Sequence, residues 1–499
     1  MNYDYTVIGG GVSGMTSALI LAKQGFSVAL VEKSGQLAPT IRGFTKKGLF
    51  FDTGFHYTGG LGTGEPVDVF FRYLGLSDAL QKVIFREDAF DFFRCLEPAF
   101  IFKFPCGYTR IRERFHEAFP DEHEAIDTYL SAVREQYHSI PYVNLDAPEE
   151  LTGFSAIHGP TLQEFLDRLT SNRLLKCILS MHCFLYGVAP DEVSFANHAY
   201  VAGSYYESVN GISGGGLKLA EAFETQLEKT GVHVYRGQEV TGVLLSGDGA
   251  LCGIALKDGT NLSSKGCIST VHPHRLLEIV PDSVFRPAYV SRLKELEETT
   301  SACILYAVCS EPIEDLAGSN IFTFPEPDFT FFHKDVAMEK RPMYITAAGE
   351  KRDGGKAKQG FIAMCPMSKE QTKPLIDPVS QERSAGYKLL KEEMSEKMVR
   401  SIRASCPEIA EKITDVTCAT PLTLRDYTNS PFGSLYGVKH KIGQYNPMPL
   451  TRLKGLFLAG QAITAPGIMG AMMSGFLACG AILGHEKLQK ELKQCRPEG

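Results

Sequence analysis

The sequence predicts an α/β fold in which one domain is assembled from separated stretches of the chain, and a second domain of mixed α+β structure is built from two insertions. Three observations predict this arrangement. A strand, a glycine-rich turn, a helix and a second strand occupy residues 4–31. Short strands interrupt a mostly helical pattern after residue 231, and a strand leading into a glycine-rich helix returns at residues 456–484. Such alternation is typical of a parallel sheet covered by helices.

The first unit has the order of a Rossmann-type dinucleotide-binding domain. An apolar strand at residues 4–8 runs directly into Gly9, a helix follows at residues 15–24, and the next strand, at residues 27–31, ends on Glu32. A carboxylate at the end of the second strand accepts hydrogen bonds from the adenosine ribose in this type of site. The order of strand, turn, helix, strand and acid therefore predicts a dinucleotide site.

The glycines of the turn have the spacing G-x-G-x-x-G, and each has a mechanical role. Gly9 permits the tight turn, Gly11 lets the backbone approach a pyrophosphate, and Gly14 lets the helix pack closely on the strand. The free N–H groups at the start of the helix, around Val12 and Ser13, face the anion.

A β-meander follows in the middle of the chain, with strands at residues 232–235, 240–246, 251–256 and 267–270. It belongs to the dinucleotide-binding domain, which we expect to comprise residues 1–75, 231–275 and 436–490. Residues 76–230, mostly helical, and residues 276–435, which begin with short strands and loops, form the expected substrate domain.

Composition argues against several classes of protein. Of 499 residues, 44% are hydrophobic and 22% are charged, which argues against a disordered, collagen-like or coiled-coil chain. The net charge is -7 and no segment concentrates basic residues, so we expect no nucleic-acid partner. The 13 cysteines are dispersed, and the N-terminus shows no signal-peptide pattern. These features predict a cytoplasmic protein.

Two further patterns are interpreted as structural. The longest apolar stretch, residues 462–484, contains Pro466 and five glycines, so we interpret it as a buried helix and not as a membrane span. Two groups of histidine and cysteine lack four ligands at zinc spacing, so we expect no metal site. These groups are His272 with His274, and Cys177 with His182 and Cys183.

Four segments together resemble a known family. They are residues 7–33, residues 51–57 (Phe-Asp-Thr-Gly-Phe-His-Tyr), the pair Glu239-Val240, and residues 455–461 leading into residues 466–471 (Pro-Gly-Ile-Met-Gly-Ala). In these segments the chain resembles the superfamily of FAD-dependent phytoene desaturases, carotenoid isomerases and retinol saturases, within the amine-oxidase-like flavoproteins. Residues 51–57, with residues 420–423 and 433–437, are most similar to the retinol saturase branch.

The resemblance implies that the cofactor is FAD. Gly467 begins a helix whose first amides are free to point at the pyrimidine edge of the flavin, where they stabilise negative charge on the reduced ring. The residues implied in FAD binding are Gly9, Gly11, Val12, Ser13, Gly14, Glu32, Lys33, Arg42, Val240, Gly460, Gln461, Gly467, Ile468 and Met469.

One position departs from the family pattern. The family places a Gly-Gly pair after the acidic residue, where its N–H groups contact the pyrophosphate, and this chain has Ala38-Pro39. Proline has no N–H, so one donor is lost. We expect Arg42 to compensate with side-chain hydrogen bonds to phosphate oxygens.

The resemblance also places residues 51–57 near the isoalloxazine ring. Reduction of a carbon–carbon double bond needs a hydride from flavin N5 and a proton from a positioned acid. His56, Tyr57 and, from the other end of the chain, Tyr436 are the candidate catalytic residues. In the alternative interpretation, His56 hydrogen-bonds only the backbone and Tyr436 lines a wall.

The expected function is that of an FAD-dependent oxidoreductase acting on a carbon–carbon double bond of a hydrophobic polyene or isoprenoid, by saturation, desaturation or redox-neutral cis–trans isomerisation. Since no nicotinamide-binding domain is visible, reducing equivalents would come from a separate electron donor or return to the same substrate, and in the second case the net result is isomerisation. A hydrophobic substrate implies contact with a membrane surface, through a helical lip such as residues 69–74 or the helix at Leu174. Two alternatives stay open, a flavin amine oxidase and a non-catalytic flavin-binding scaffold.

Overall fold

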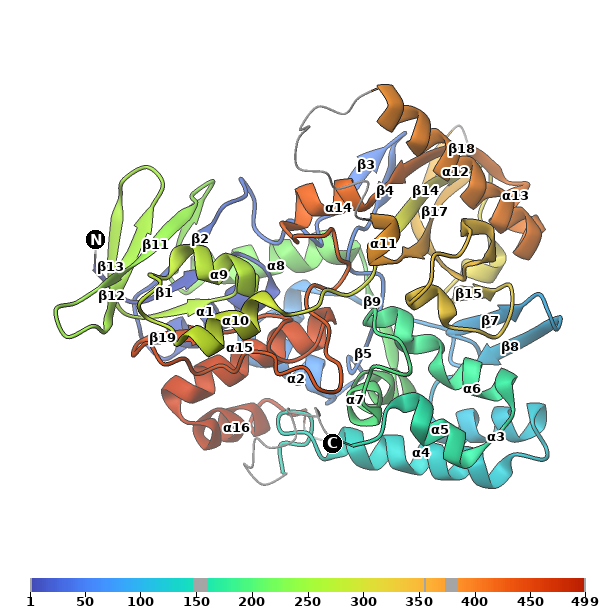
Figure 1. Cartoon of the computed structure of the whole chain (residues 1–499), viewed down its shortest axis with the longest axis horizontal. Helices are drawn as coiled ribbons and strands as arrows, with labels where there is room; N and C mark the ends of the chain where they lie inside the picture. The colour runs from blue at the N-terminus through green and yellow to red at the C-terminus, as the bar shows by residue number, and fades with distance from the viewer. Residues whose placement is uncertain (1, 147–158, 354–355, 373–384, 498–499) are drawn as a thin grey trace.

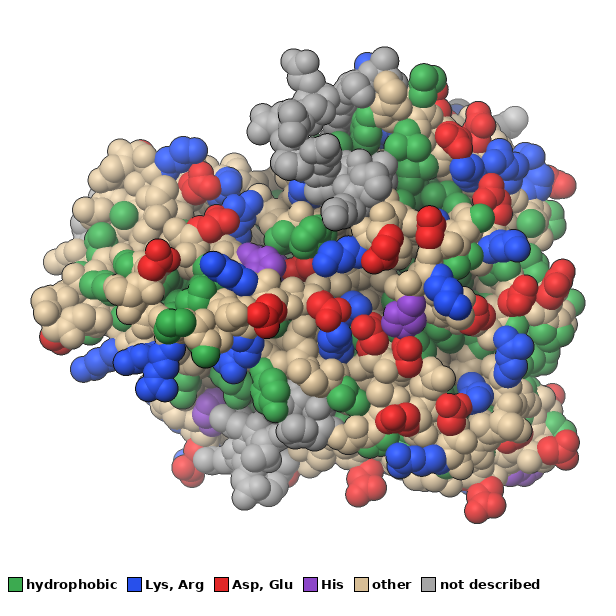
Figure 2. Space-filling view, in the orientation of Figure 1, with side chains coloured by type: hydrophobic (Ala, Val, Ile, Leu, Met, Phe, Trp, Pro, Cys, Tyr) green, Lys and Arg blue, Asp and Glu red, His purple; other side chains and the backbone are tan. Residues whose placement is uncertain are grey.

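The computed structural model describes residues 2–146, 159–353, 356–372 and 385–497, and contains two seven-stranded sheets. In Figure 1 one sheet lies at the left of the molecule and the other at the upper right, with a group of helices below the second sheet. Figure 2 shows acidic and basic side chains interspersed over the visible face.

The first sheet has a parallel core flanked by an antiparallel meander. Its parallel strands are β1 (Asn2–Ile8), β2 (Val28–Glu32), β10 (His233–Arg236), β13 (Asn261–Ser269) and β19 (Leu456–Leu458). From β13 the meander continues into β12 (Leu251–Leu256) and β11 (Val240–Leu245). The order β10-β2-β1-β13-β12-β11, with β19 beside β13, confirms the predicted Rossmann-type sheet. The strand near residue 233 differs from the prediction, because it pairs in parallel with β2 and not with the meander.

Helices α1 (Val12–Lys23) and α8 (Gly215–Lys229) pack against this sheet, and α15 (Gly467–Leu483) packs on α1 in the same apolar core. Helix α15 is the buried helix that the apolar stretch predicts. The Ser13 hydroxyl donates to the carbonyl oxygen of Ala471 at 2.7 Å. A Cβ added at Gly475 would lie 3.1 Å from the carbonyl oxygen of Ser13, so the glycine permits the two helices to approach closely. Helices α1 and α15 therefore contact each other near their N-terminal ends.

The second sheet is antiparallel apart from one pair of strands. Its order is β18 (Ile413–Ala419), β14 (Ser301–Cys309), β17 (Lys356–Met367), β16 (Met343–Asp353), β15 (Asn320–Phe324), β7 (Asp91–Cys95) and β8 (Phe100–Phe104). Strands β15 and β7 are the parallel pair. The mixed α+β architecture expected for the insertions is confirmed.

Helices and short strands complete this second region. An aromatic core joins the sheet to α3 (Tyr108–Ala118), α4 (His123–His138), α5 (Leu162–Leu169), α6 (Arg173–Ser180) and α7 (Phe195–Glu207), and α12 (Ala385–Ser405) packs in another apolar cluster of the sheet. A small sheet of β5 (Thr58–Gly59), β9 (Val209–Ile212) and β6 (Lys82–Ile84) lies beside α7. The remaining elements are β3 (Phe44–Lys46), β4 (Leu49–Phe51), α2 (Pro66–Leu74), α9 (Pro273–Ile279), α10 (Pro287–Lys294), α11 (Lys369–Thr372), α13 (Pro407–Ala410), α14 (Pro421–Thr428) and α16 (His485–Lys493).

The structure contradicts the expectation that residues 69–74 form an exposed lip. These residues lie in α2, whose apolar side chains are buried in the core of the first region. The Phe70 ring packs against the Phe476 ring of α15 with centroids 4.6 Å apart. On α6, Leu174 is half-buried and the other apolar side chains are buried. Within the described ranges, no helix is both long enough and apolar enough to cross a bilayer.

The strands of the first sheet come from residues 2–32, 233–269 and 456–458, and those of the second sheet come from residues 91–104 and 301–419. Helix α8 precedes residue 231, the predicted start of the middle stretch, yet it packs on α1 in the core of the first region. The exact residues at which the predicted domains begin and end therefore remain a prediction.

We expect Gly14→Ala to destabilise the fold. A Cβ at this position would lie 1.9 Å from the carbonyl oxygen of Gly9, so α1 would have to move away from β1. Overpacking of this kind lowers the free energy of unfolding by about 1–3 kcal/mol. Urea denaturation of the cofactor-free protein measures the change. Gly11→Ala is the matched control, because a Cβ at Gly11 has no atom within 4 Å. An equal loss in both variants would contradict the packing role of Gly14.

Candidate functional site

The glycine-rich turn forms an open cradle in front of α1. Gly9 has a φ of +102°, which an L side chain rarely adopts, and the space next to Gly11 is empty within 4 Å of a would-be Cβ. Gly11 is the N-cap of α1, so no side chain caps the helix and no acidic residue lies in its first turn. The free N–H groups at Val12 and Ser13 are therefore available to an anion such as a pyrophosphate.

Glu32 lies beside this cradle at the end of β2. Its carboxylate accepts hydrogen bonds from the backbone N–H groups of Gly10 at 2.6 Å and Ser34 at 2.7 Å. A carboxylate has about four acceptor positions, so the two oxygens can still accept from ribose hydroxyls. Val240 begins β11 close by, since the N–H of Gln238 donates to the Glu32 carbonyl oxygen at 3.0 Å. The structure thus places the start of β11 two residues after a backbone hydrogen bond to Glu32.

Two predicted basic residues have acidic partners in this structure. The Lys33 ammonium pairs with Glu239 at 2.7 Å, and 56% of its side chain is exposed. The Arg42 guanidinium donates to the Leu37 carbonyl oxygen at 2.6 Å and pairs with Glu224 at 2.8 Å. In this arrangement Arg42 fixes the loop that precedes it.

The Ala38-Pro39 pair occupies the same loop. Ala38 has a φ of +50°, the left-handed region that favours glycine, and its N–H donates to the Gly10 carbonyl oxygen at 2.8 Å. The backbone has therefore kept the conformation of a glycine position although the residue is alanine. The Ala38 N–H is engaged by the turn itself.

The C-terminal segment forms a second cradle beside the first. The Gly460 N–H donates to the Ser474 hydroxyl at 2.8 Å, and the same hydroxyl lies 3.1 Å from that of Ser13. Gly467 has a φ of +84° and begins α15 with no side-chain cap and no atom within 4 Å of a would-be Cβ. Gln461 is exposed, and its carbonyl oxygen accepts from the His440 ring at 2.7 Å. Two uncapped helix N-termini thus lie near each other, an arrangement that fits the pyrophosphate and flavin of FAD.

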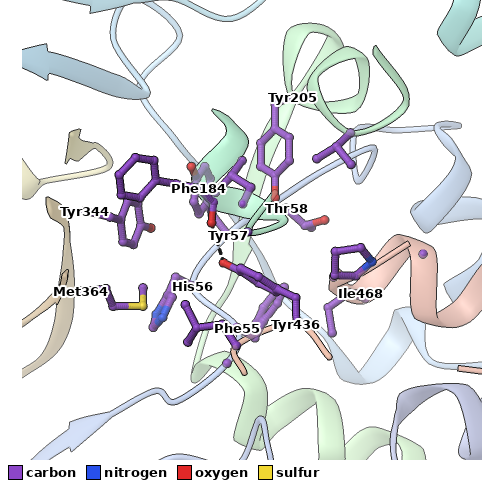
Figure 3. Close-up of a pocket in the computed structure, with 18 of the residues that line it drawn as sticks. Phe55, His56, Tyr57, Thr58, Phe184, Tyr205, Tyr344, Met364, Tyr436 and Ile468 are labelled. Carbon is purple, nitrogen blue, oxygen red and sulfur yellow. Dashed lines mark hydrogen bonds between the residues drawn. The ribbon is translucent and has the colours of Figure 1, made fainter. Parts of the chain in front are cut away.

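A pocket adjoins the start of α15 (Figure 3). Residues 466–470 form one wall, and all three predicted catalytic residues, His56, Tyr57 and Tyr436, line the others. Many of the lining side chains are aromatic: Phe55, Tyr57, Phe184, Tyr200, Tyr205, Phe332, Tyr344 and Tyr436. None of the described residues that line this pocket is an aspartate, glutamate, lysine or arginine. The pocket is therefore apolar, with hydroxyl groups as its main polar atoms.

His56 is neutral in this pocket. Burial lowers its pKa to about 4, because the surrounding protein replaces the water that would solvate an imidazolium. Its ring centroid lies 6.2 Å from that of Tyr344. At neutral pH His56 can accept or donate a hydrogen bond, but it carries no spare proton to release as an acid.

Three pocket tyrosines donate their hydroxyl protons to the protein. The acceptors are the Asp91 carboxyl for Tyr57 at 3.3 Å, the Asn320 side-chain oxygen for Tyr344 at 3.1 Å, and the Phe184 carbonyl for Tyr436 at 2.9 Å. The last of these bonds is the dashed line in Figure 3. Tyr57 differs from the other two, since its acceptor is itself a group that can hold a proton.

Tyr205 on α7 is a pocket residue that the sequence analysis missed. Its hydroxyl has no hydrogen-bond partner among the described residues, and Figure 3 shows it directed toward the interior between Thr58 and Ile468. A Cβ added at Gly59 would lie 2.5 Å from the Tyr205 backbone nitrogen, so β5 packs tightly on α7 here. The helical periodicity of residues 195–207 gives no signal that distinguishes Tyr205 from a core side chain.

A buried polar cluster lies behind Tyr57, and the sequence analysis missed its role. Asp91, His182 and Asn320 are each 0% exposed. The His182 Nε2 atom lies 3.1 Å from the Asp91 carboxyl, and the Asn320 amide donates to Asp91 at 2.8 Å. Burial raises the pKa of Asp91, with hydrogen bonds from His182 and Asn320 opposing the shift. These residues come from different strands and helices, so no local sequence motif predicts the cluster.

The two histidine and cysteine groups behave differently from one another. His272, His274 and Glu298 place ligand atoms within 4.8 Å of one another. The His272 Nδ1 atom accepts the His274 backbone N–H at 3.3 Å and its Nε2 atom lies 2.7 Å from Glu298, so the ring caps α9 and faces a carboxylate. His182 is directed to Asp91 and away from a metal arrangement with Cys177.

Comparison with known sequences gives a match to the family described as flavin containing amine oxidoreductase over residues 12–483. The chain is 24% identical to the all-trans-retinol 13,14-reductase of Danio rerio, over 98% of this chain and 87% of that protein. It is 23% identical to an inactive all-trans-retinol 13,14-reductase of Danio rerio, over 97% of this chain and 86% of that protein. It is also 23% identical to the 4,4'-diapolycopene oxygenase of Methylomonas sp, over 94% and 95% of the two chains.

Solved structures with the same fold cover nearly the whole chain. An oxidoreductase from Methanosarcina mazei has a TM-score of 0.65 at 16% identity, covering 95% of this chain and 99% of the other. Putrescine oxidase bound to putrescine has a TM-score of 0.64 at 12% identity, covering 99% of each chain. These identities support the fold alone. Because the family match extends from the first turn of α1 to the end of α15, the chain belongs to the flavin-containing amine oxidoreductase family.

Proposed function

We propose that this FAD-dependent oxidoreductase acts on a carbon–carbon double bond of an extended hydrophobic polyene or isoprenoid. The observation that carries the proposal is the composition of the pocket beside α15, which is apolar and aromatic and has no charged residue among its described lining. Retinoid and carotenoid proteins among the similar sequences support the same substrate class. The proposal covers saturation, desaturation and isomerisation of such a substrate.

An amine is the competing substrate class. Alkylamines are cations at neutral pH, and a buried cation needs a nearby carboxylate or well-placed aromatic faces. The described lining offers no carboxylate, and His56 is neutral. The aromatic faces of the tyrosines could still bind a cation, so an amine is the second candidate substrate. A direct comparison of polyenes with amines decides between the two classes.

FAD, when bound, supplies hydride chemistry at flavin N5. The protein's own contribution is to bind the pyrophosphate at the start of α1, to hold the ribose at Glu32 and to place the double bond beside residues 466–470. Saturation consumes two electrons from a separate donor. In isomerisation the same hydride and proton return to the substrate, so no donor is needed.

Tyr57 is the proposed proton donor among the three predicted catalytic residues. A buried phenolate is unstable, and burial raises the pKa of Tyr57 well above its ordinary value. A tyrosine that gives away its proton therefore needs a neighbour that replaces it. Tyr57 has Asp91 as such a neighbour, whereas Tyr436 faces a backbone carbonyl. Tyr205, with its free hydroxyl, is placed to hydrogen-bond a polar group of the substrate.

Glu32→Ala should weaken FAD binding by about 1.5–3 kcal/mol, which is roughly 10- to 150-fold in affinity, because a charge-assisted hydrogen bond to the ribose is lost. Gly11→Ala should also weaken it, since a methyl group would fill the open cradle. Titration of the cofactor-free protein with FAD, followed by flavin fluorescence, measures both. Lys257→Ala is the control, because that side chain is 72% exposed and pairs with Glu239 at the surface. Unchanged retention in Glu32→Ala would remove Glu32 from the site.

Substrate class is tested with the flavin loaded and oxygen removed. Polyenes such as retinoids or carotenoids should be converted by the chemically reduced protein, and deuterium at flavin N5 should appear on the former double bond. Primary and secondary amines should leave the oxidised flavin unreduced. Rapid flavin reduction by an amine, with no conversion of polyenes, would favour the amine-oxidase alternative, and no reaction with either would favour the scaffold.

Tyr57→Phe should slow the proton-dependent step by about 10²- to 10⁴-fold, the usual contribution of a positioned acid. Tyr205→Phe, the matched control from the same pocket, should raise KM with a smaller effect on kcat, because it removes a substrate contact and no proton donor. Both variants should retain FAD. Single-turnover rates in H₂O and D₂O separate the two effects. A larger loss of kcat in Tyr205→Phe than in Tyr57→Phe would transfer the acid role to Tyr205.

A further inference from the structure

Asp91 is a buried carboxyl group that pairs with a histidine, His182. It lies on β7 with 0% exposure, and within the part of the chain that the structure describes no lysine or arginine pairs with it. Most buried carboxylates are paired with a cation. Asp68, which is also nearly fully buried, pairs with Arg72 at 2.9 Å and with Lys82 at 2.7 Å. An unpaired buried carboxylate costs several kcal/mol.

The histidine beside Asp91 is badly placed to be that cation. His182 is 0% exposed and its Nδ1 atom has no hydrogen-bond partner in the described structure. Its ring stacks on Phe90, with centroids 6.1 Å apart, and meets the edge of Phe104 at 5.1 Å. A protonated imidazole would leave a charged N–H unsatisfied among aromatic rings, which is more costly than a neutral one. His182 is therefore best accommodated as a neutral ring whose Nε2–H donates to Asp91.

The hydrogen bonds around Asp91 lead to the pocket wall. The Asn320 amide donates to one oxygen of Asp91, and Tyr57 and His182 both contact the other oxygen. The Asn320 side-chain oxygen in turn accepts from Thr346 at 2.7 Å and from Tyr344 at 3.1 Å. The amide orientation of Asn320 is thereby fixed, so it offers Asp91 a donor and no acceptor. The Tyr57 hydroxyl donates to Asp91 at 3.3 Å in this structure. When Tyr57 directs its proton to the substrate instead, its oxygen becomes free to accept the proton of a protonated Asp91.

We propose that Asp91 is a protonated proton store that resupplies Tyr57 during turnover. The inference rests on the proposed function for its kinetic part. When the Tyr57 O–H bond breaks and its proton adds to the substrate carbon, the Asp91 O–H proton moves to the Tyr57 oxygen, so no phenolate remains. The negative charge passes to Asp91, where Asn320 and His182 donate to it. Solvent protons restore the Asp91 acid after the product leaves, and no electrons enter or leave this step.

Infrared spectroscopy of the FAD-loaded protein tests the resting state without any substrate. The wild-type protein should show a carboxylic-acid C=O stretch at neutral pH that is absent in Asp91→Asn, a variant that keeps the side-chain shape. Tyr57→Phe should shift this band to higher frequency, because one hydrogen-bond partner is lost. Asp68→Asn is the matched control and should leave the band unchanged, since Asp68 is ionised by its two basic partners. Absence of the band, or a band that Tyr57→Phe does not shift, overturns the proposal.

Kinetics test the transfer. Asp91→Asn should lower single-turnover conversion of a polyene by a factor similar to that of Tyr57→Phe, and the double variant should be no slower than either single one. FAD retention and the circular dichroism spectrum report whether each variant is folded. If Asp91→Asn turns over at the wild-type rate, the relay is wrong. If the wild-type protein converts no polyene, the proposed function fails by itself, and the infrared bands still decide the protonation and contact of Asp91.

Discussion

The close contact between two helix N-termini is the constraint on which the rest of this structure depends. Gly14 lets α1 lie against β1 at the Gly9 carbonyl, and Ser13 connects the first turn of α1 to Ala471 and Ser474 of α15. A larger side chain at Gly14 would move α1 away from β1, and one at Gly475 would push α15 away from α1. Because they remain together, one cradle for a dinucleotide is formed by residues from both ends of the chain. The pocket then begins where α15 begins.

The pocket is organised around the exclusion of charge. Burial keeps His56 neutral and keeps Tyr57 protonated, and the described lining has no aspartate, glutamate, lysine or arginine. Removing water from an apolar substrate costs no free energy when it enters such a pocket, whereas removing water from a charged substrate costs several kcal/mol unless the charge is paired. The Asp91 carboxyl is buried behind Tyr57, which lines the pocket. A proton held on Asp91 therefore lies near the pocket, and the pocket lining itself carries no charge.

Much of the candidate dinucleotide site could be predicted from the sequence, because its parts are local. The turn between Gly9 and Gly14 and the acid at the end of β2 depend on neighbouring residues, and the structure has them as expected. The three candidate catalytic residues also share one pocket, although they are distant in sequence. The predicted role of Arg42 is less simple, since Glu224 from α8 holds its guanidinium. Such a partner, far away in sequence, leaves no trace in the local pattern.

The sequence by itself determined the Rossmann-type unit, the meander and the buried character of α15, since periodicity and glycine spacing act over a few residues. Tertiary structure decided which apolar segments face inward. The sequence alone is compatible with a surface lip at residues 69–74, but in the structure their side chains are buried, with Phe70 packed on Phe476. Tertiary structure also decided the partners of two pocket hydroxyls. The Tyr57 hydroxyl donates to the Asp91 carboxyl, and the Tyr205 hydroxyl has no hydrogen-bond partner among the described residues. Hydrogen-bond partners and burial are set by residues brought together across the fold, and these control both pKa and reactivity.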